Sequence, residues 1–186
     1  MVRDPARARG DVSTQPGKAG GAPLLITAEL PPDILAWADD LRRLHYPPER
    51  NRLRAHVTLF HGLPPSAEGE VRRLLGELAK RPPVDAGISG IWNMGKGTAF
   101  DVDSPDMEEL HALMRERFAG IMSAQDDRQL RIHITVQNKV SYEAARQLQW
   151  ELKKGFTPRS FRFWGFGLYA WEDGLWRPIA EYPFRH

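Results

Sequence analysis

The chain has 186 residues, of which 41% are hydrophobic and 27% charged, as in an ordinary globular domain. It contains no cysteine and no apolar run long enough to cross a bilayer, which excludes disulfides, thiol nucleophiles, thiolate metal sites and membrane-spanning helices. The formal net charge of +2 arises within residues 1–22. Residues 23–186 therefore lack the overall positive charge that binds long nucleic acids. We expect a cytoplasmic protein that engages its substrate at one focused site.

Residues 1–22 are rich in Ala, Gly, Pro and Arg, and they show neither a hydrophobic stretch nor a periodic pattern. This composition predicts a disordered N-terminal tail rather than a secretory signal or a packed element. Residues 23–186 are long enough for one domain with a sizeable core, and we expect them to form a single domain.

From Pro23 onward, apolar alternation and helical spacing predict an ordered series of strands and helices. The first half is expected to contain strands at 24–30, 53–60 and 87–93, separated by helices that begin near Pro31 and Ser66. The second half repeats this order and adds a closing hairpin, with strands at 99–103, 130–138, 161–170 and 176–182 and helices after Ser104 and Ser141.

The most informative feature of the chain is a repeated pentapeptide. The segment Arg54-Ala55-His56-Val57-Thr58 returns as Arg131-Ile132-His133-Ile134-Thr135, and each copy lies in a predicted strand. Because successive side chains of a strand point to opposite faces, each copy places its Arg, His and Thr on one face and its apolar residues on the other. Each copy can therefore present polar groups to a site while its apolar face enters a core.

The repeat extends beyond the motifs. Sliding the sequence by the interval between them also aligns 86–93 with 163–170, both of which are predicted strands. We infer a bilobal α/β (α+β) fold of two β-α-β-α-β lobes, 23–95 and 96–186, related by a pseudo-twofold axis. Two equivalent motif strands that face each other across this axis would bring His56 and His133 into one cleft.

These residue types suit a metal-free phosphodiester site. Thr58, Thr135 and the Arg54 and Arg131 guanidinium groups can donate hydrogen bonds to phosphate oxygens. Displacement at phosphorus requires one proton to be removed and another to be delivered, and two imidazoles that titrate near neutrality can perform both transfers. A lone His-x-Thr is more often structural, so the inference depends on the pair. A metal site is disfavoured because neither motif strand presents a carboxylate or thiol on the same face.

Three other aromatic or imidazole side chains are candidates for a role in the site. Tyr169, in the closing hairpin, is expected to stack on a base of the substrate. Trp92 has apolar neighbours and is expected in the core. His61 follows the first motif strand but falls on the opposite parity from His56, so we expect it to lie outside the site.

At the two motifs the chain resembles the 2H phosphoesterase superfamily, and in particular its LigT-like branch of bacterial 2′-5′ RNA ligases and RNA 2′,3′-cyclic phosphodiesterases. The likeness covers residues 23–186. It implies mainly antiparallel sheets that line a central cleft, with no metal and no cofactor. It also implies that His56 is the proton donor and His133 the acceptor, and that Thr58 and Thr135 bind the phosphate.

The function implied by this resemblance is hydrolysis of 2′,3′-cyclic phosphates of RNA ends or nucleotides to 2′-phosphates, with 2′-5′ RNA ligation as the reverse reaction. One alternative substrate is a small nucleotide such as the cyclic phosphate derived from ADP-ribose. A different class of function is a nucleotide- or RNA-binding module without catalysis. We expect a monomer that has no obligate protein partner and no membrane association.

Overall fold

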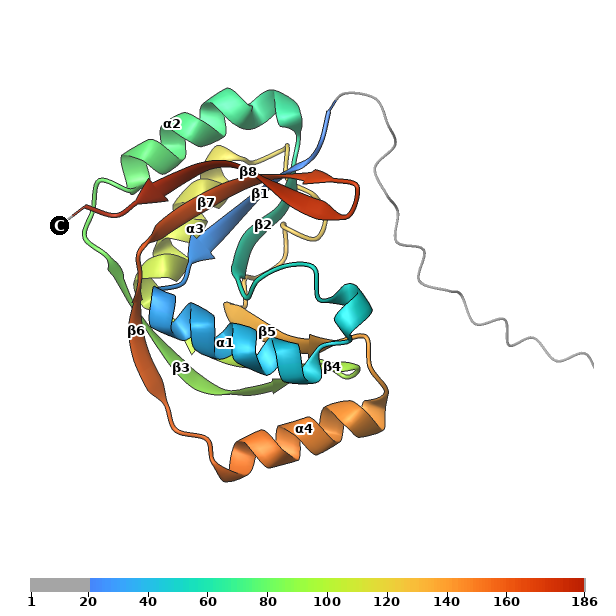
Figure 1. The fold of residues 1–186 in the computed structure, drawn as a ribbon. Coiled ribbons are helices and arrows are strands. Elements are labelled where there is room, and N and C mark those ends of the chain that lie inside the picture. Colours follow the sequence, from blue (N-terminus) through green and yellow to red (C-terminus); the bar gives the residue numbers. More distant parts are fainter. Residues whose placement is uncertain (1–20, 186) are drawn as a thin grey trace, which may run out of the picture.

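The structure is a computed structural model that describes residues 21–185 (Figure 1). Residues 1–20, which make up most of the tail predicted to be disordered, lie outside the described residues. Two four-stranded antiparallel sheets form the body of the molecule, as the α+β prediction requires. Their strand orders are β2-β1-β7-β8 and β5-β4-β3-β6.

The order of elements along residues 21–185 agrees with the sequence prediction. The first sheet consists of β1 (Leu24–Glu29), β2 (Val57–Leu63), β7 (Gly165–Glu172) and β8 (Leu175–Pro183). The second consists of β3 (Val84–Asn93), β4 (Gly97–Asp103), β5 (His133–Asn138) and β6 (Arg159–Phe163). The α-helices are α1 (Pro32–His45), α2 (Glu68–Leu78), α3 (Pro105–Arg117) and α4 (Tyr142–Lys154), and short 3₁₀ turns occupy Pro48–Arg50 and Pro65–Ala67.

The predicted lobe boundaries, 23–95 and 96–186, are wrong because each half of the chain gives its third strand to the other sheet. β3, from the first half, pairs with β4 and β6, whereas β7, from the second half, pairs with β1. The predicted strand 161–170 is accordingly two strands, β6 and β7, which belong to different sheets. The orders β2-β1-β7 and β5-β4-β3 remain equivalent, so the pseudo-twofold arrangement is retained with the third strands exchanged.

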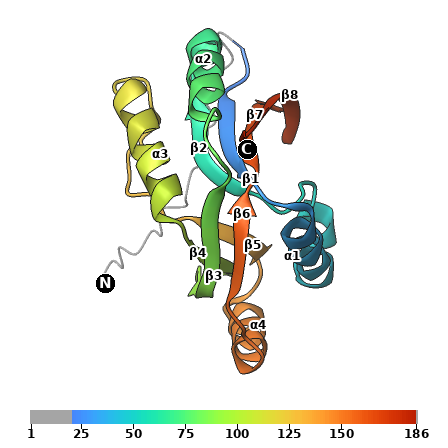
Figure 2. The ribbon, with the colours of Figure 1, turned by 90° about the vertical axis from the view of Figure 1, so that its left-hand side faces the viewer.

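The helices that follow β1 and β4 also cross between the halves. α1 packs on the second sheet, where the ring of Trp37 lies 4.8 Å from that of Phe100 in β4. Near the end of α3, Phe118 lies 5.5 Å from Phe60 of β2 in the first sheet. Figure 2 shows α1 and α3 on opposite sides of the strands. The two sheets therefore share one hydrophobic core and are tied together by both halves of the sequence.

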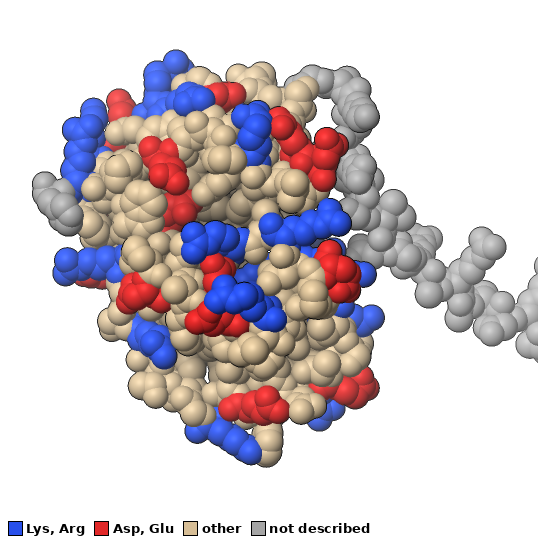
Figure 3. Space-filling view, viewed as in Figure 1, with Lys and Arg blue, Asp and Glu red and all other residues tan. Residues whose placement is uncertain are grey.

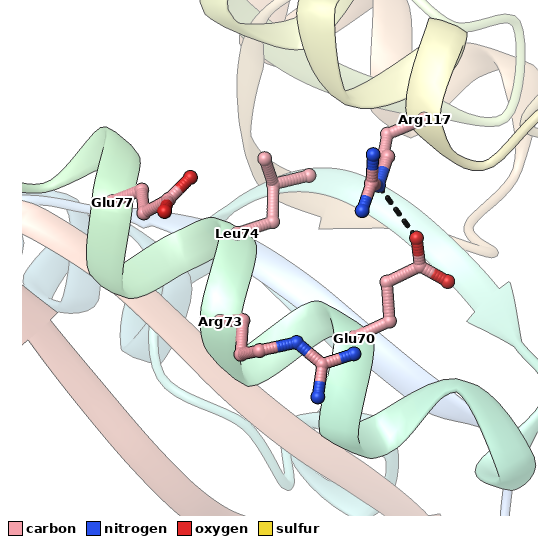
Figure 4. Close-up of a pocket in the computed structure, with 5 residues that line it drawn as sticks. All are labelled: Glu70, Arg73, Leu74, Glu77 and Arg117. Atoms are coloured by element: carbon pink, nitrogen blue, oxygen red, sulfur yellow. Dashed lines mark hydrogen bonds and ion pairs between the residues drawn. The ribbon is translucent and has the colours of Figure 1, made fainter.

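On the outer surface, basic and acidic side chains are intermingled on the face seen in Figure 3, in keeping with the charge balance of the sequence. A groove between α2 and α3 illustrates this mixture (Figure 4). Arg117 donates to Glu70 at 2.6 Å across it, and Arg73 and Glu77 line the same groove. Because two acidic and two basic side chains line the groove, it has no net charge that would attract an ion.

None of the helices within residues 21–185 combines the length and the apolar character that a membrane crossing requires.

One end of the first sheet depends on a glycine. Gly165 in β7 pairs with β1 on one side and β8 on the other, and a Cβ there would lie 2.8 Å from the Cα of Pro183. Because the backbone of β8 would have to shift, Gly165→Ala is expected to lower the free energy of unfolding by about 1–3 kcal/mol in urea denaturation. The control is Gly155→Ala, whose Cβ meets nothing within 4 Å. Equal losses in the two variants would contradict this close approach.

Candidate active site

The two motif strands, β2 and β5, are edge strands of their sheets, and they contribute to one cleft of about 480 Å³. The four residues predicted to be catalytic all line this cleft: His56, Thr58, His133 and Thr135. Each is half-buried, so each has one side against the protein and another toward the cleft. The structure thus brings together side chains that lie far apart in the sequence.

The orientation of both motif imidazoles is fixed by the backbone. Nδ1 of His56 lies 2.7 Å from the carbonyl oxygen of Arg54, and Nδ1 of His133 lies 2.7 Å from that of Arg131. A carbonyl oxygen can only accept a hydrogen bond, so each Nδ1 carries a proton and donates it. In the neutral rings Nε2 is then an unprotonated base, and in the charged rings it is an acid. The Arg-x-His spacing therefore selects the tautomer through the main chain of the arginine.

Each histidine also contacts a tryptophan from another strand. The His56 ring lies 4.4 Å from that of Trp176 in β8, and the His133 ring lies 4.9 Å from that of Trp92 in β3, edge to face. Both indoles line the cleft. The prediction that Trp92 is a core residue is wrong. Trp92 pairs with Ala99, and Ala99 pairs with Thr135. Because paired residues of neighbouring strands share a face of the sheet, Trp92 lies on the same face as Thr135. Sequence reasoning did not identify Trp176.

The histidines are held in an environment that disfavours their charged forms. Burial lowers the pKa of His56 to about 4, and the charges of Arg42, His133 and His61 act in the same direction. Burial also lowers the pKa of His133, but there the carboxylate of Asp101 opposes the effect. Asp101 pairs directly with His133 across the β4–β5 ladder. Both rings are therefore neutral at pH 7 when the cleft holds no anion.

The two motif arginines occupy different positions. Arg131 lines the cleft, donates to both oxygens of Asp101 at 2.7 and 2.9 Å, and lies over the Trp92 ring at 4.3 Å. Arg54 instead points away to Asp39 of α1, at 2.9 Å, and does not line the cleft. The segment before β2 is outside the sheet, where Asp39 also accepts from the amide of Ala55, so strand alternation does not control Arg54.

Tyr169, predicted to stack on a base, is engaged within the first sheet. Its hydroxyl donates to Glu29 at 3.0 Å, and Thr27 donates to the same carboxylate oxygen at 2.5 Å. Burial and the negative charge of Glu29 raise the pKa of Tyr169. Its ring lies 5.5 Å from that of Trp176, whereas Tyr169 itself does not line the cleft. Tyr169 therefore supports the indole that contacts His56.

A bulge in each motif strand brings one further residue into the cleft. In β2, Thr58 pairs with Thr27 and Phe60 with Ile26, so Leu59 is an extra residue and the parity changes after it. His61 consequently lines the cleft, and the prediction that its parity excludes it is wrong. In β5, Val136 is the corresponding extra residue, and Asn138 lines the cleft. No period-two pattern in the sequence could reveal these bulges.

Two edge strands, each with a tethered His and a neighbouring Thr facing one cleft, have the arrangement of the 2H phosphoesterases. The chain belongs to the 2′-5′ RNA ligase superfamily, whose family model matches residues 30–175. The resemblance inferred from the motifs is thereby confirmed.

Solved structures with a similar fold include E. coli LigT complexed with 3′-AMP, at 21% identity and a TM-score of 0.61 over 89% of this chain and 99% of that one. The protein TT0787 of Thermus thermophilus is 15% identical, with a TM-score of 0.60 over 88% of this chain and 98% of that one. E. coli LigT has also been solved with NADP+ and with ATP. The comparison with curated proteins gave no match.

The lowered histidine pKa values predict how stability depends on pH. Between pH 6.5 and about 4 the unfolded chain binds protons that the folded His56 and His111 do not, and the lowered pKa of His133 acts in the same direction. The free energy of unfolding should therefore be fully retained above pH 6.5 and should fall as the pH drops through this window. In urea unfolding, His56→Asn is expected to lose less of its free energy of unfolding as the pH drops, because one histidine with a lowered pKa has been removed. His45→Asn, outside the cleft, should retain the wild-type dependence, and an unchanged dependence in the His56 variant would contradict the assignment.

Proposed function

We propose that this protein is a metal-independent phosphodiesterase that hydrolyses 2′,3′-cyclic phosphates of RNA ends or nucleotides to 2′-phosphates. The observation that carries the proposal is the pair of identically tethered imidazoles, His56 and His133, in one cleft. With each Nδ1 committed to a carbonyl, both Nε2 atoms are left for proton transfer. The hydroxyls of Thr58 and Thr135 supply donors for the phosphate oxygens.

In the proposed reaction a neutral imidazole removes a proton from water as the water oxygen bonds to phosphorus. The bond from phosphorus to the 3′ oxygen breaks, and the second ring, as imidazolium, gives its proton to that oxygen. The products are a 3′-hydroxyl and a 2′-phosphate. Attack by a 5′-hydroxyl on the cyclic phosphate, in place of water, would form a 2′-5′ linkage by the same proton transfers.

The free protein does not favour the donor and acceptor roles implied by the resemblance. His56, the implied donor, has its pKa lowered by burial and by the charges of Arg42, His133 and His61, with no carboxylate to oppose them. His133, the implied acceptor, has Asp101 to favour its charged form. A bound phosphodiester raises the pKa of both rings through its negative charge. We propose that one proton is taken up with the substrate and that its position follows the orientation of the cyclic phosphate.

Nucleotide substrates are supported by the indoles of Trp92 and Trp176, which flank the two histidines from opposite sheets. Aromatic faces stack on any base, so they suit RNA ends of varied sequence. A cleft with an indole beside each imidazole has room for a base on either side of the reacting phosphate. Residues 23–186 act as one functional domain in this reaction, because each sheet contains strands from both halves.

Removal of either imidazole is expected to reduce turnover by orders of magnitude. His56→Ala and His133→Ala should each reduce the rate by about 10²–10⁴-fold, because one proton transfer loses its catalyst. The measurement is hydrolysis of a panel of cyclic-phosphate substrates, with chelator present, and identification of the phosphate isomer formed.

The panel includes oligonucleotides with cyclic ends, mononucleotides and the cyclic phosphate derived from ADP-ribose, so it also identifies the substrate class. His45→Ala is the matched control and should retain activity, while thermal unfolding checks that each variant is folded. Full turnover in either cleft variant would refute the two-histidine mechanism. Binding of cyclic nucleotides by the wild type with no product would instead favour a non-catalytic module.

The indole of Trp176 is expected to contribute to binding more than to chemistry. Trp176→Ala should weaken nucleotide binding by about 1–3 kcal/mol, through loss of a stacking surface. The exposed Trp150 of α4, outside the cleft, provides the control substitution to alanine. Affinities of a cyclic mononucleotide for both variants, measured by calorimetry, test the assignment, and equal affinities would contradict it.

A further inference from the structure

A third histidine lies in the wall of the cleft and is held by a buried carboxylate. Nδ1 of His61 lies 2.9 Å from Oδ1 of Asp126, whose side chain has no exposed surface. The same carboxylate accepts from the amide of His61 at 2.8 Å, from the amide of Gly62 at 3.1 Å and from the hydroxyl of Ser123 at 2.8 Å. Asp126 is therefore fixed by four hydrogen bonds from β2 and the segment after α3.

The hydrogen bonds that Asp126 accepts favour the ionised form of its carboxylate. Burial alone would raise the pKa of Asp126, but the hydrogen bonds from His61 and Ser123 hold it below its usual range. An ionised carboxylate only accepts, so His61 donates through Nδ1 and its Nε2 lies on the opposite edge of the ring. The His61 side chain is 40% exposed and lines the cleft. A protonated His61 would thus present a charge-assisted donor with its counter-charge already in place behind it.

The position of His61 is one of the duplicated positions of the fold. Equivalent bulges place His61 after Thr58 and Asn138 after Thr135, and both residues line the cleft. On the Asn138 side the amide oxygen accepts from the neighbouring backbone amide of Lys139, at 2.8 Å. The two halves therefore place a polar side chain at the same point, an imidazole supported by a carboxylate in the first half and an amide in the second.

We propose that His61 is an anion-binding residue of the cleft, which donates from Nε2 to a phosphoryl oxygen of the substrate while Asp126 holds its ring. The inference rests on the proposed function and assigns a further residue to the same site. A positive charge on His61 would disfavour protonation of both His56 and His133. A phosphoryl oxygen between these rings offsets that repulsion, so the three imidazoles are compatible when an anion is bound.

The cleft around His61 has room for more than the reacting phosphate. The segment after α3 contributes Gln125 and Arg128 to the wall beside it, and Arg131 lines the same cleft. His61 can therefore donate its hydrogen bond either to the cyclic phosphate itself or to the next phosphate of an RNA chain. Both provide the same ligand chemistry, an anionic phosphoryl oxygen, and the substrate tested distinguishes them.

The test compares His61→Gln with the matched control His45→Gln, a histidine of α1 that does not line the cleft. Loss of the charge-assisted bond should raise KM for a dinucleotide with a cyclic end by about 10- to 100-fold, with a smaller change in kcat. An equal loss with a cyclic mononucleotide would place the contact on the reacting phosphate, and a loss confined to the dinucleotide would place it on the next phosphate. Unchanged KM values for both substrates would overturn the proposal.

A binding readout separates this inference from the proposed function. The imidazole nitrogen resonances of His61 are followed by NMR in the folded His133→Ala protein during titration with inorganic phosphate. A shift at His61 that saturates supports the assignment even if no substrate is hydrolysed. The absence of any shift at His61, while phosphate binds elsewhere in the cleft, would overturn it even in an active enzyme.

Discussion

Both motif strands lie at the edges of their sheets, so each has one side that no neighbouring strand covers. The rest of the structure depends on how other elements cover these two edges. An edge strand exposes unpaired backbone groups that need partners. In β5 the carbonyl of Thr135 accepts from the buried Arg42 of α1 at 2.9 Å. In β2 the ring of Phe60 stacks on that of the buried His111 of α3, with 4.8 Å between the ring centroids. In each case a buried polar side chain on a helix from the other half of the chain contacts the edge strand.

This crossing explains why the two halves cannot be separated into lobes. Each sheet takes its third strand from the opposite half, and each edge strand takes its covering helix from there too. A site built between β2 and β5 is therefore held on both sides by elements that connect the sheets. Small relative movements of the sheets would disturb the core, where Phe60 and Phe100 pack against the crossing helices. Such rigidity suits acid–base chemistry, which depends on the placement of two rings.

The sequence predicted the succession of elements and the four cleft residues, because local alternation and the repeated motif carry that information directly. It did not predict the exchange of β3 and β7, since an apolar alternating strand has the same pattern whichever sheet receives it. It also failed at His61, because a bulge of one residue reverses parity without leaving a mark on composition. Trp92 was misplaced for a related reason. Its face is set by its pairing with Ala99, which only the register reveals.

A duplicated site raises a question of direction, because a symmetric pair of histidines would accept a cyclic phosphate in either orientation. The described carboxylates break this symmetry. Asp101 pairs with His133 and is engaged by Arg131. In the first sheet, Glu29 of β1 instead accepts from the neutral hydroxyl of Tyr169.

These differences place unlike surroundings on the two sides of the phosphate. The His133 side has an ion pair and an indole held beneath a guanidinium group. The His56 side has an indole supported by a tyrosine. A substrate whose base and ribose differ from its leaving group will bind these two surroundings with different free energies. In the reaction that we propose, the preferred orientation, and with it the identity of the proton donor, would then be decided by contacts outside the motifs that the two halves share.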